Sequence, residues 1–207
     1  MKFRNAWTVL IGSIALLAVA SSAFAEDGRP SVWLSGGAQA LNSNDTAFPD
    51  DFVNVPIVGS LNYPLTSVLS VEGEFTWMLP IEQEVDVAAG QTQMAKTPDV
   101  LFYQGNIKAT LPTSGSLSPY VVAGAGAATF LSNTDSNRVP ALDQSETAFA
   151  VNFGTGLSYR LSPSWSLRGD LREFVAFPKS DAAGLSSGGD ADEVWTERGT
   201  LGLGYHF

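Results

Sequence analysis

Eight charged residues occupy positions that would gather them on one face of a sheet. Several lie two residues apart, as Glu72 and Glu74 do, and side chains two apart on a β-strand share a face. Because buried charges persist only when they are paired and hydrogen-bonded, we expect a network of ion pairs in the interior of a sheet structure. The predicted network consists of Glu72, Glu74, Lys108, Arg160, Arg168, Asp170, Arg172 and Arg198.

This network admits two interpretations. Five cations and three anions in a narrow interior would form a salt-bridged plug that makes the structure rigid. Alternatively, the pairs would exchange partners and open a narrow conduit for ions or small solutes. The plug is the interpretation that we favour from the sequence, with the gate as its alternative.

Nucleophilic and metal chemistry find little support. The only histidine is His206, one residue from the C-terminus. An enzyme that acts on membrane lipid would instead place a histidine beside a serine and a carboxylate, on the lipid-facing side or in long surface loops. We therefore expect no enzyme, no catalytic residue, no metal site and no cofactor or cofactor-binding residue.

Acidic residues concentrate in four long connections, near residues 42–52, 80–99, 132–147 and 179–193. These hold 14 carboxylates against Lys96, Arg138 and Lys179. A solvated, repulsive surface is the favoured interpretation. A divalent-cation site is the alternative, because hard cations prefer oxygen ligands, although none of the loops has a complete ligand spacing.

The elements that must position these charges are β-strands, because apolar and polar residues alternate with a period of two. In one segment Leu69, Val71 and Phe75 alternate with Ser70 and Glu74. Six clear segments lie at 53–63, 69–79, 101–111, 149–160, 165–175 and 195–207, and two weaker ones at 32–41 and 120–131. Trp33 and Gln39 lie opposite Val32 and Leu34 in the first weak segment, whereas the facing of the glycine-rich second one stays open.

Connections alternate between short, uncharged turns and the long acidic loops. This alternation is typical of up-and-down barrels of the outer membrane. We therefore expect an all-β fold, an eight-stranded antiparallel up-and-down transmembrane β-barrel.

Aromatic residues distinguish a membrane barrel from a soluble one. They gather at both ends of the apolar face, as two belts that flank a membrane's hydrocarbon would. Near the short turns the belt comprises Tyr63, Tyr159, Trp165, Tyr205 and Phe207, and near the long loops it comprises Trp77, Tyr103, Phe149 and Trp195. Glu173 and Glu197 break the pattern, because both fall on the apolar phase; either a bulge re-aims them or they lie above the hydrocarbon.

The first 25 residues are expected to be a cleaved signal peptide, which leaves residues 26–207 as the barrel domain. Lys2 and Arg4 precede an apolar run that is short for a membrane span, and Ala23-Phe24-Ala25 offers a cleavage site. Without Lys2 and Arg4, 9 basic residues face 21 acidic ones, a formal net charge of −12. Such a charge argues against nucleic acid as a partner.

Three segments carry a resemblance to a known family. The end of the chain, Leu201-Gly-Leu-Gly-Tyr-His-Phe207, resembles the C-terminal assembly signal of outer-membrane barrels, and residues 119–126 and 153–168 resemble the fifth to seventh strands of OmpA/OmpX-like small barrels. The resemblance implies a cell-envelope protein related to the porin family in a Gram-negative outer membrane. Outer-membrane lipid, lipopolysaccharide and the barrel assembly machinery are the implied partners. The chain departs from OmpA by stopping at the barrel, so a peptidoglycan-tethering role is not implied.

The function expected from the sequence is a structural or surface-interaction role for a monomeric barrel with a largely occluded, polar lumen. The alternative is a narrow porin-like channel.

Overall fold

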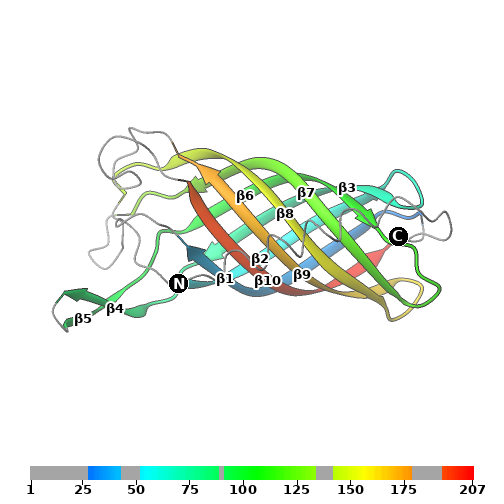
Figure 1. The fold of residues 1–207 in the computed structure, drawn as a ribbon, viewed down its shortest axis with the longest axis horizontal. Helices are drawn as coiled ribbons and strands as arrows, with labels where there is room; N and C mark the ends of the chain where they lie inside the picture. Colours follow the sequence, from blue (N-terminus) through cyan, green and yellow to red (C-terminus); the bar gives the residue numbers. More distant parts are fainter. Residues whose placement is uncertain (1–27, 43–51, 89–90, 134–141, 179–192) are drawn as a thin grey trace.

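Ten strands make up the regular structure of the described chain. The computed structural model describes residues 28–42, 52–88, 91–133, 142–178 and 193–207, so the expected signal peptide lies outside the described residues. Figure 1 shows a single elongated barrel with a small hairpin beside one end. The strands are β1 (Ser31–Asn42), β2 (Phe52–Pro64), β3 (Leu69–Leu79), β4 (Gln83–Ala88), β5 (Gln91–Ala95), β6 (Val100–Thr110), β7 (Leu117–Phe130), β8 (Glu146–Arg160), β9 (Trp165–Phe177) and β10 (Val194–His206).

Eight of these strands close into one barrel in the order β1-β10-β9-β8-β7-β6-β3-β2. Every neighbouring pair is antiparallel. The closing pair, β1 and β10, runs in unbroken register from Ser31 opposite His206 to Asn42 opposite Trp195. Closure leaves no sheet edge, as a structure in hydrocarbon requires, and the prediction of eight barrel strands is confirmed.

The two faces of the barrel wall reverse the usual arrangement of a soluble protein. Large apolar side chains point outward, with Leu34 66% and Leu201 77% exposed, whereas Glu72, Lys108 and Arg198 are no more than 2% exposed. An exposed apolar surface of this extent marks a membrane-facing structure. In the described parts of the chain, no helix has the length and apolar character needed to cross a membrane.

The structure shows which side chains point into the lumen on β1 and β7, the two strands whose sequence alternation was weak. In β1, Trp33 and Gln39 are buried inside, whereas Val32 and Leu34 are exposed outside. In β7, inward positions include Tyr120 and a glycine-rich stretch, which lets this strand lie close to β6. A Cβ at Gly124 would come within 2.0 Å of the Asn106 side-chain oxygen, so the absence of a side chain there makes room for the amide of Asn106.

The strand ends that the short turns join lie at one end of the barrel, and the strand ends that lead into the long connections lie at the other (Figure 1). The C-terminus is at the short-turn end. At the long-loop end, β4 and β5 form a separate two-stranded antiparallel sheet, although the sequence predicted only a loop there. A signal was present, because Val85 and Val87 alternate with acidic residues ahead of Gly90, a pattern typical of a hairpin.

Candidate functional site in the barrel lumen

Among the described residues, six ion pairs lie in the middle of the lumen, and four of them join β3 to β9 or β10. The carboxylate of Glu72 on β3 contacts Arg168 at 2.6 Å and Arg172 at 2.8 Å, both on β9. In the barrel order, β3 and β9 are four strands apart in either direction, so these pairs connect opposite walls. A charge on one wall therefore holds the other wall in place.

Arg172 is the centre of this arrangement. Besides Glu72, its guanidinium contacts Glu74 at 3.1 Å and Asp170 at 2.8 Å. Arg198 on β10 contacts Glu74 at 2.9 Å and Asp170 at 3.7 Å. Each carboxylate thus pairs with two arginines, and we name this set the luminal cluster: Glu72, Glu74, Arg168, Asp170, Arg172 and Arg198.

Neutral polar side chains complete the shell around Glu72. The amide of Asn106 donates to its carboxylate at 3.2 Å, and the hydroxyl of Ser60 donates to it at 3.4 Å. Arg168 in turn donates to the Ser60 oxygen at 3.1 Å. Buried ions keep their charge only with such additional hydrogen bonds, and these residues occupy inward positions on β2 and β6.

Aromatic rings cover two of the arginines. The guanidinium carbon of Arg168 lies 4.7 Å from the ring centroid of Trp33, and that of Arg198 lies 4.6 Å from the ring centroid of Phe174. Both distances are within the range of cation–π attraction, which is strongest where water is excluded. Neither aromatic partner was among the predicted site residues.

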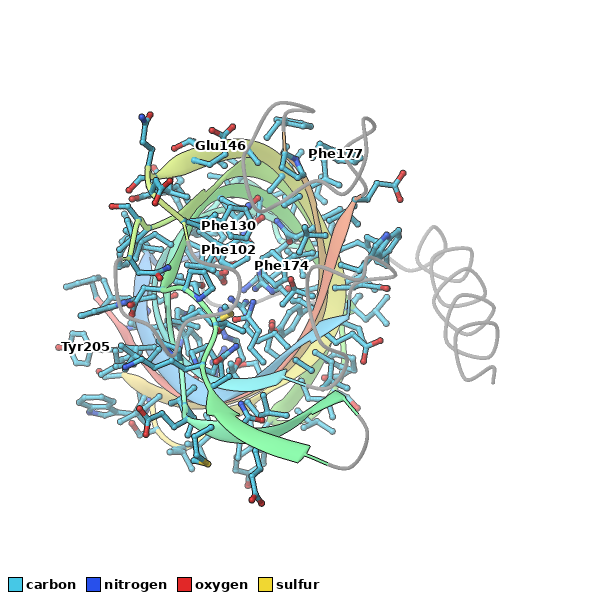
Figure 2. All side chains as sticks on the ribbon, turned by 90° about the vertical axis from the view of Figure 1, so that its left-hand side faces the viewer. Phe102, Phe130, Glu146, Phe174, Phe177 and Tyr205 are labelled. Carbon is cyan, nitrogen blue, oxygen red and sulfur yellow. The ribbon has the colours of Figure 1, made fainter. Side chains whose placement is uncertain are left out.

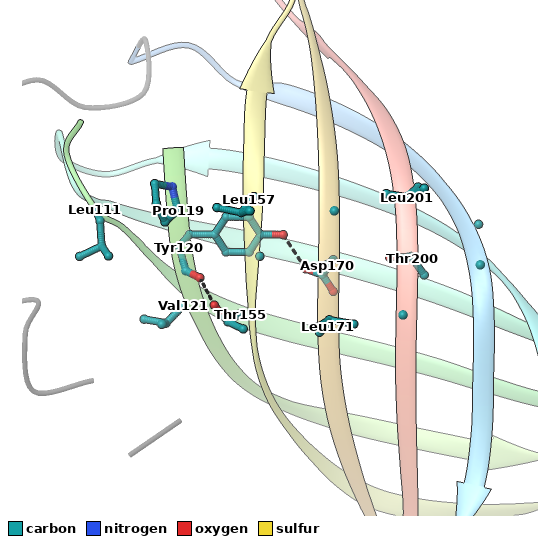
Figure 3. A pocket seen from close by; sticks show the side chains of 15 residues that line it. Leu111, Pro119, Tyr120, Val121, Thr155, Leu157, Asp170, Leu171, Thr200 and Leu201 are labelled. Atoms are coloured by element: carbon teal, nitrogen blue, oxygen red, sulfur yellow. Dashed lines mark hydrogen bonds between the residues drawn. The ribbon is translucent and has the colours of Figure 1, made fainter. Parts of the chain in front are cut away.

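Tyr120 is a further member of the site that the sequence did not identify. Its hydroxyl donates to Asp170 at 2.6 Å, as Figure 3 shows behind the barrel wall. The ring fits against β8 because Gly156 has no side chain there: a Cβ at Gly156 would lie 2.3 Å from the Tyr120 oxygen. The facing of this segment could not be assigned from its alternation, so its contribution became visible only in the folded barrel.

Lys108 and Arg160 lie on the short-turn side of the luminal cluster. Lys108 is buried, with its ammonium 5.2 Å from the ring centroid of Tyr120. Arg160 is exposed, which differs from the expectation that it shares the buried network. The reason is its position as the last residue of β8, where the lumen meets solvent.

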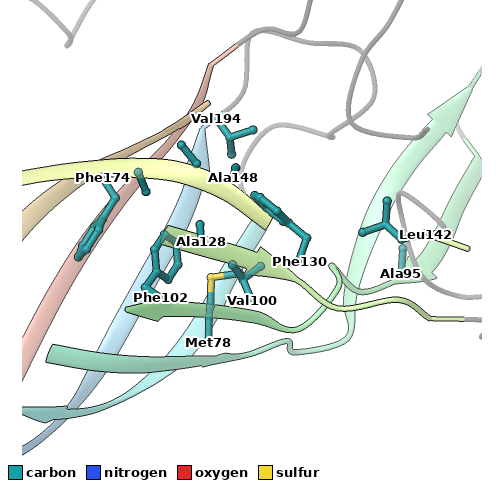
Figure 4. Close-up of a cluster of buried hydrophobic side chains, with 12 residues drawn as sticks. Met78, Ala95, Val100, Phe102, Ala128, Phe130, Leu142, Ala148, Phe174 and Val194 are labelled. Atoms are coloured by element: carbon teal, nitrogen blue, oxygen red, sulfur yellow. The ribbon is translucent and has the colours of Figure 1, made fainter. Parts of the chain in front are cut away.

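The long-loop half of the lumen is apolar, which differs from the expected polar interior. Phe102, Phe130 and Phe174 point into the barrel when it is viewed from that end (Figure 2). The rings of Phe102 and Phe174 are 5.0 Å apart between centroids. We call this group the apolar layer (Figure 4): Met78, Ala95, Val100, Phe102, Ala128, Phe130, Leu142, Ala148, Ala150, Phe174, Ala176 and Val194.

A sequence signal for the apolar layer did exist. At these strand ends both phases of the alternation are apolar, as in Val100 to Tyr103 and in Phe174 to Phe177. Since one phase faces lipid, the other must place apolar side chains inside. Loop residue Leu142 and Ala95 of β5 extend the layer beyond the barrel strands.

The aromatic residues predicted for the belts lie on the outward phase. Trp165, Tyr205 and Phe207 form a chain of ring contacts at the short-turn end, with centroid distances of 5.1 and 5.4 Å. At the other end the indole nitrogens of Trp77 and Trp195 donate to carboxylates of Asp99 and Glu193. The exposed residues are Tyr63, Trp77, Tyr103, Phe149, Tyr159, Trp165, Tyr205 and Phe207, and Trp195 is half-buried.

Glu173 and Glu197 both face outward and lie directly opposite one another across β9 and β10. The register of this pair of strands is continuous from Val194 to Tyr205. A bulge therefore does not re-aim either side chain. The carboxylates lie next to the rung formed by Trp195 and Val175, near the long-loop end of the apolar band.

His206 is buried at the short-turn rim, where its Nε2 atom is 2.9 Å from the hydroxyl of Ser166. Among the described residues, no group of three or more His, Cys, Asp or Glu side chains could hold a metal ion. Much of the acidic loop sequence, including Asp50, Asp51, Asp190 and Asp192, lies outside the described residues.

A closed, eight-stranded antiparallel barrel with an apolar exterior, aromatic belts and a charged lumen defines a transmembrane barrel of the bacterial outer membrane. Residues 11–207 match the family described as outer membrane protein beta-barrel domain. The chain belongs to this family, and its location is the Gram-negative outer membrane. A search among curated proteins finds no match.

Solved structures show the same fold at low sequence identity. The N-terminal β-barrel domain of Pseudomonas aeruginosa OprF is 16% identical, covers 87% of this chain and 98% of its own, and has a TM-score of 0.53. Neisserial surface protein A is 14% identical with the same coverages and a TM-score of 0.56. Ail of Yersinia pestis, in complex with the heparin analogue sucrose octasulfate, is 17% identical, with coverages of 88% and 100% and a TM-score of 0.52.

Proposed function

We propose that this protein is a structural and surface-interaction component of the outer membrane with a closed lumen. The observation that carries the proposal is the stacking of two barriers. The luminal cluster spans the barrel from wall to wall, and the apolar layer fills the lumen on its long-loop side.

Passage of an ion would have to overcome both barriers. Separating a buried pair leaves an uncompensated charge, which costs about 3–5 kcal/mol. The apolar layer adds a constriction that excludes water, and hydrophobic constrictions close pores by dewetting. The combined arrangement favours a rigid plug over a gate.

Planar-bilayer recording tests this proposal. We expect the refolded protein to give no steady single-channel steps, while its gel mobility shifts on heating as for a folded barrel. Lys96→Gln is the control, because Lys96 lies in the surface connection and pairs with Glu82 at 3.8 Å. Steady steps that change in Arg168→Gln but not in Lys96→Gln would contradict the plug.

That contradicting outcome would support the alternative, a narrow porin-like channel for ions or small solutes. The observation in its favour is that the short-turn half of the lumen is polar. Buried Lys108, Thr110 and Ser166 lie there, on the short-turn side of the luminal cluster. A conducting state would then require the ion pairs and the apolar layer to rearrange together.

The acidic loops argue against direct binding of a polyanion at the cell surface. Ail is solved with a heparin analogue, whereas the 14 loop carboxylates of this chain would repel such a ligand. We propose instead that divalent cations bridge these loops to anionic lipopolysaccharide. Loop proteolysis should slow when Mg²⁺ or Ca²⁺ is added to protein in lipopolysaccharide-containing bilayers, and an unchanged rate would count against the bridge.

Other parts of the proposal concern assembly and chemistry. Residues 1–25 direct export and are removed, the terminal Phe207 contributes to recognition by the barrel assembly machinery, and the mature barrel is a monomer. We also propose that it is not an enzyme, because its single histidine lies at the short-turn rim and hydrogen-bonds Ser166, away from the long loops.

A further inference from the structure

A hollow of about 680 Å³ lies in the outer surface of the barrel wall. It crosses five neighbouring strands, from β7 through β8, β9 and β10 to β1. We call it the wall groove, and its floor and sides are formed chiefly by Gly36, Gly169, Gly199, Leu157, Leu171 and Leu201. All three leucines are exposed on the outward phase of their strands, so the wall groove opens toward lipid rather than into the lumen.

Alternation of large and small residues across the strands creates the wall groove. Along one rung of the wall, Gly36 lies opposite Leu201 and Leu201 lies opposite Gly169. Gly169 in turn lies opposite Leu157. The following rung repeats the alternation one strand out of step. Figure 3 shows the two rungs as two rows of side chains, with Leu157 and Leu201 in the same row.

The leucines lie above glycines of the neighbouring strands. A Cβ at Gly199 would lie 3.3 Å from the Cδ2 atom of Leu171, and a Cβ at Gly169 would lie 3.5 Å from the Cδ2 atom of Leu201. Leu201 is nevertheless 77% exposed, because only one of its sides rests on the wall. The glycines therefore form the floor of the wall groove, and the leucines form its sides.

The floor offers hydrocarbon contacts rather than hydrogen bonds. The hydroxyl of Thr155 faces outward in the floor, and it donates to the backbone carbonyl of Tyr120 at 2.9 Å (Figure 3). A polar group whose hydrogen bond is already made can lie in an apolar environment. The chemistry of the wall groove therefore fits a hydrocarbon chain better than a headgroup or a sugar.

The wall groove begins near the short-turn rim and rises toward the middle of the membrane. Pro119 lies two residues from the short-turn end of β7, whereas Gly36 lies five residues from the short-turn end of β1. Crossing five strands that are spaced about 4.8 Å apart gives the groove a length of roughly 19 Å. Because the strands of such barrels tilt by about 35–45°, the groove rises by roughly 12 Å. This rise stays within one leaflet, since the whole hydrocarbon core is about 30 Å thick.

These dimensions fit one acyl chain that enters from the leaflet on the short-turn side. A second barrel fits less well, because its convex wall would rest on the leucines without reaching the glycine floor. A flexible chain can follow the floor and gain dispersion contacts with the leucines on both sides. We propose that the wall groove holds one acyl chain of a glycerophospholipid from this leaflet, which is the periplasmic one in barrels of this architecture. This lipid stays bound while its neighbours exchange.

Native mass spectrometry of the refolded barrel tests this site. The barrel is refolded in vesicles of dimyristoyl phosphatidylcholine and then transferred to a detergent that removes loosely attached lipid. We expect one phospholipid per barrel to remain. The same result is expected with dimyristoyl phosphatidylglycerol, because the groove contacts the chain and not the headgroup.

Gly169→Phe fills the middle of the wall groove and should lose most of the retained lipid. The ring has room to enter, because a Cβ at Gly169 meets only the flexible end of Leu201. Ala125→Phe is the matched control. It places the same ring at an exposed, outward position of β7 that does not line the groove, and it should retain the lipid.

Heat-modifiable gel mobility shows whether each variant is folded. If Gly169→Phe does not fold, Gly36→Phe gives the same test at the β1 end, where a Cβ would lie 3.6 Å from the carbonyl oxygen of Pro56. Wild-type barrels without retained lipid, or equal retention by the groove variant and Ala125→Phe, would overturn the proposal. Paired barrels without lipid would also overturn it, by assigning the groove to a second copy of the chain.

Discussion

Individual buried charges in this protein act in pairs, and the pairs of Glu72 and Glu74 with Arg172 connect opposite walls. Arg172 contacts all three carboxylates of the luminal cluster, and residues separated by 96 to 100 positions in the chain meet there. Removal of one carboxylate therefore leaves two arginines with one anion fewer. At the residue scale the ion pairs are a source of stability only while they are complete.

Glu72→Gln tests this dependence. The substitution keeps the shape of the side chain but leaves Arg168 and Arg172 with one anion fewer, so we expect the free energy of unfolding to fall by about 3–5 kcal/mol. Urea unfolding of the refolded barrel, followed by tryptophan fluorescence, measures the change.

The matched control is Glu82→Gln at the surface. Glu82 pairs with Lys96 at 3.8 Å and its side chain is 51% exposed, so its removal should cost no more than about 1 kcal/mol. Equal effects of the two substitutions would mean that the luminal pairs contribute no more than surface pairs do.

The strands are the elements that sort side chains between lipid and lumen. On β10, Leu201 and Leu203 face outward, whereas Arg198 and Thr200 face inward. The same strand therefore contributes to the membrane surface and to the luminal cluster. The effect of an outward-facing substitution on stability should therefore depend on its depth in the membrane rather than on contacts with the luminal cluster.

Leu201→Arg places a charge on the outward phase at the middle of β10. We expect it to destabilise the folded barrel by about 2–4 kcal/mol in lipid, because an arginine near the bilayer midplane loses its hydration. Leu65→Arg is the control, since Leu65 is exposed in a short turn at the end of the barrel, where about 0–1 kcal/mol is expected. Unfolding titrations in lipid vesicles compare the two substitutions. A larger loss of stability for Leu65→Arg than for Leu201→Arg would show that the membrane does not surround the middle of β10.

The whole molecule has two chemically different ends. Fourteen carboxylates belong to the long connections, whereas the short turns carry no charged side chain. In outer-membrane barrels the long loops lie on the extracellular side and the short turns on the periplasmic side. The orientation in turn decides which partners each end can meet.

Single-cysteine labelling tests this orientation, because the chain contains no cysteine. Glu84 is exposed on β4 and Ser114 is exposed in a short turn, and each is replaced singly by cysteine. A maleimide polymer too large for porins should label Glu84→Cys in intact cells, and Ser114→Cys only after the outer membrane is permeabilised. The reverse pattern would show an inverted barrel.

The sequence by itself determined the fold class, the eight barrel strands and the two faces of the wall. These properties are local, because alternation with a period of two records which side of a strand meets lipid, and Leu69 to Leu79 shows it without reference to any other strand. The weak alternation around Gly124 and Gly126 left one strand undefined for the same reason: glycine carries no side chain that could indicate a face.

Only the tertiary structure decided which charges meet and what closes the lumen. Arg172 reaches Glu72 and Glu74 because barrel closure places β9 opposite β3, which no local pattern encodes. Phe102 and Phe174 meet for the same reason, and their contact makes the long-loop half of the lumen apolar. Arg160, identical in type to the buried arginines, stays exposed because its strand ends where the wall meets solvent.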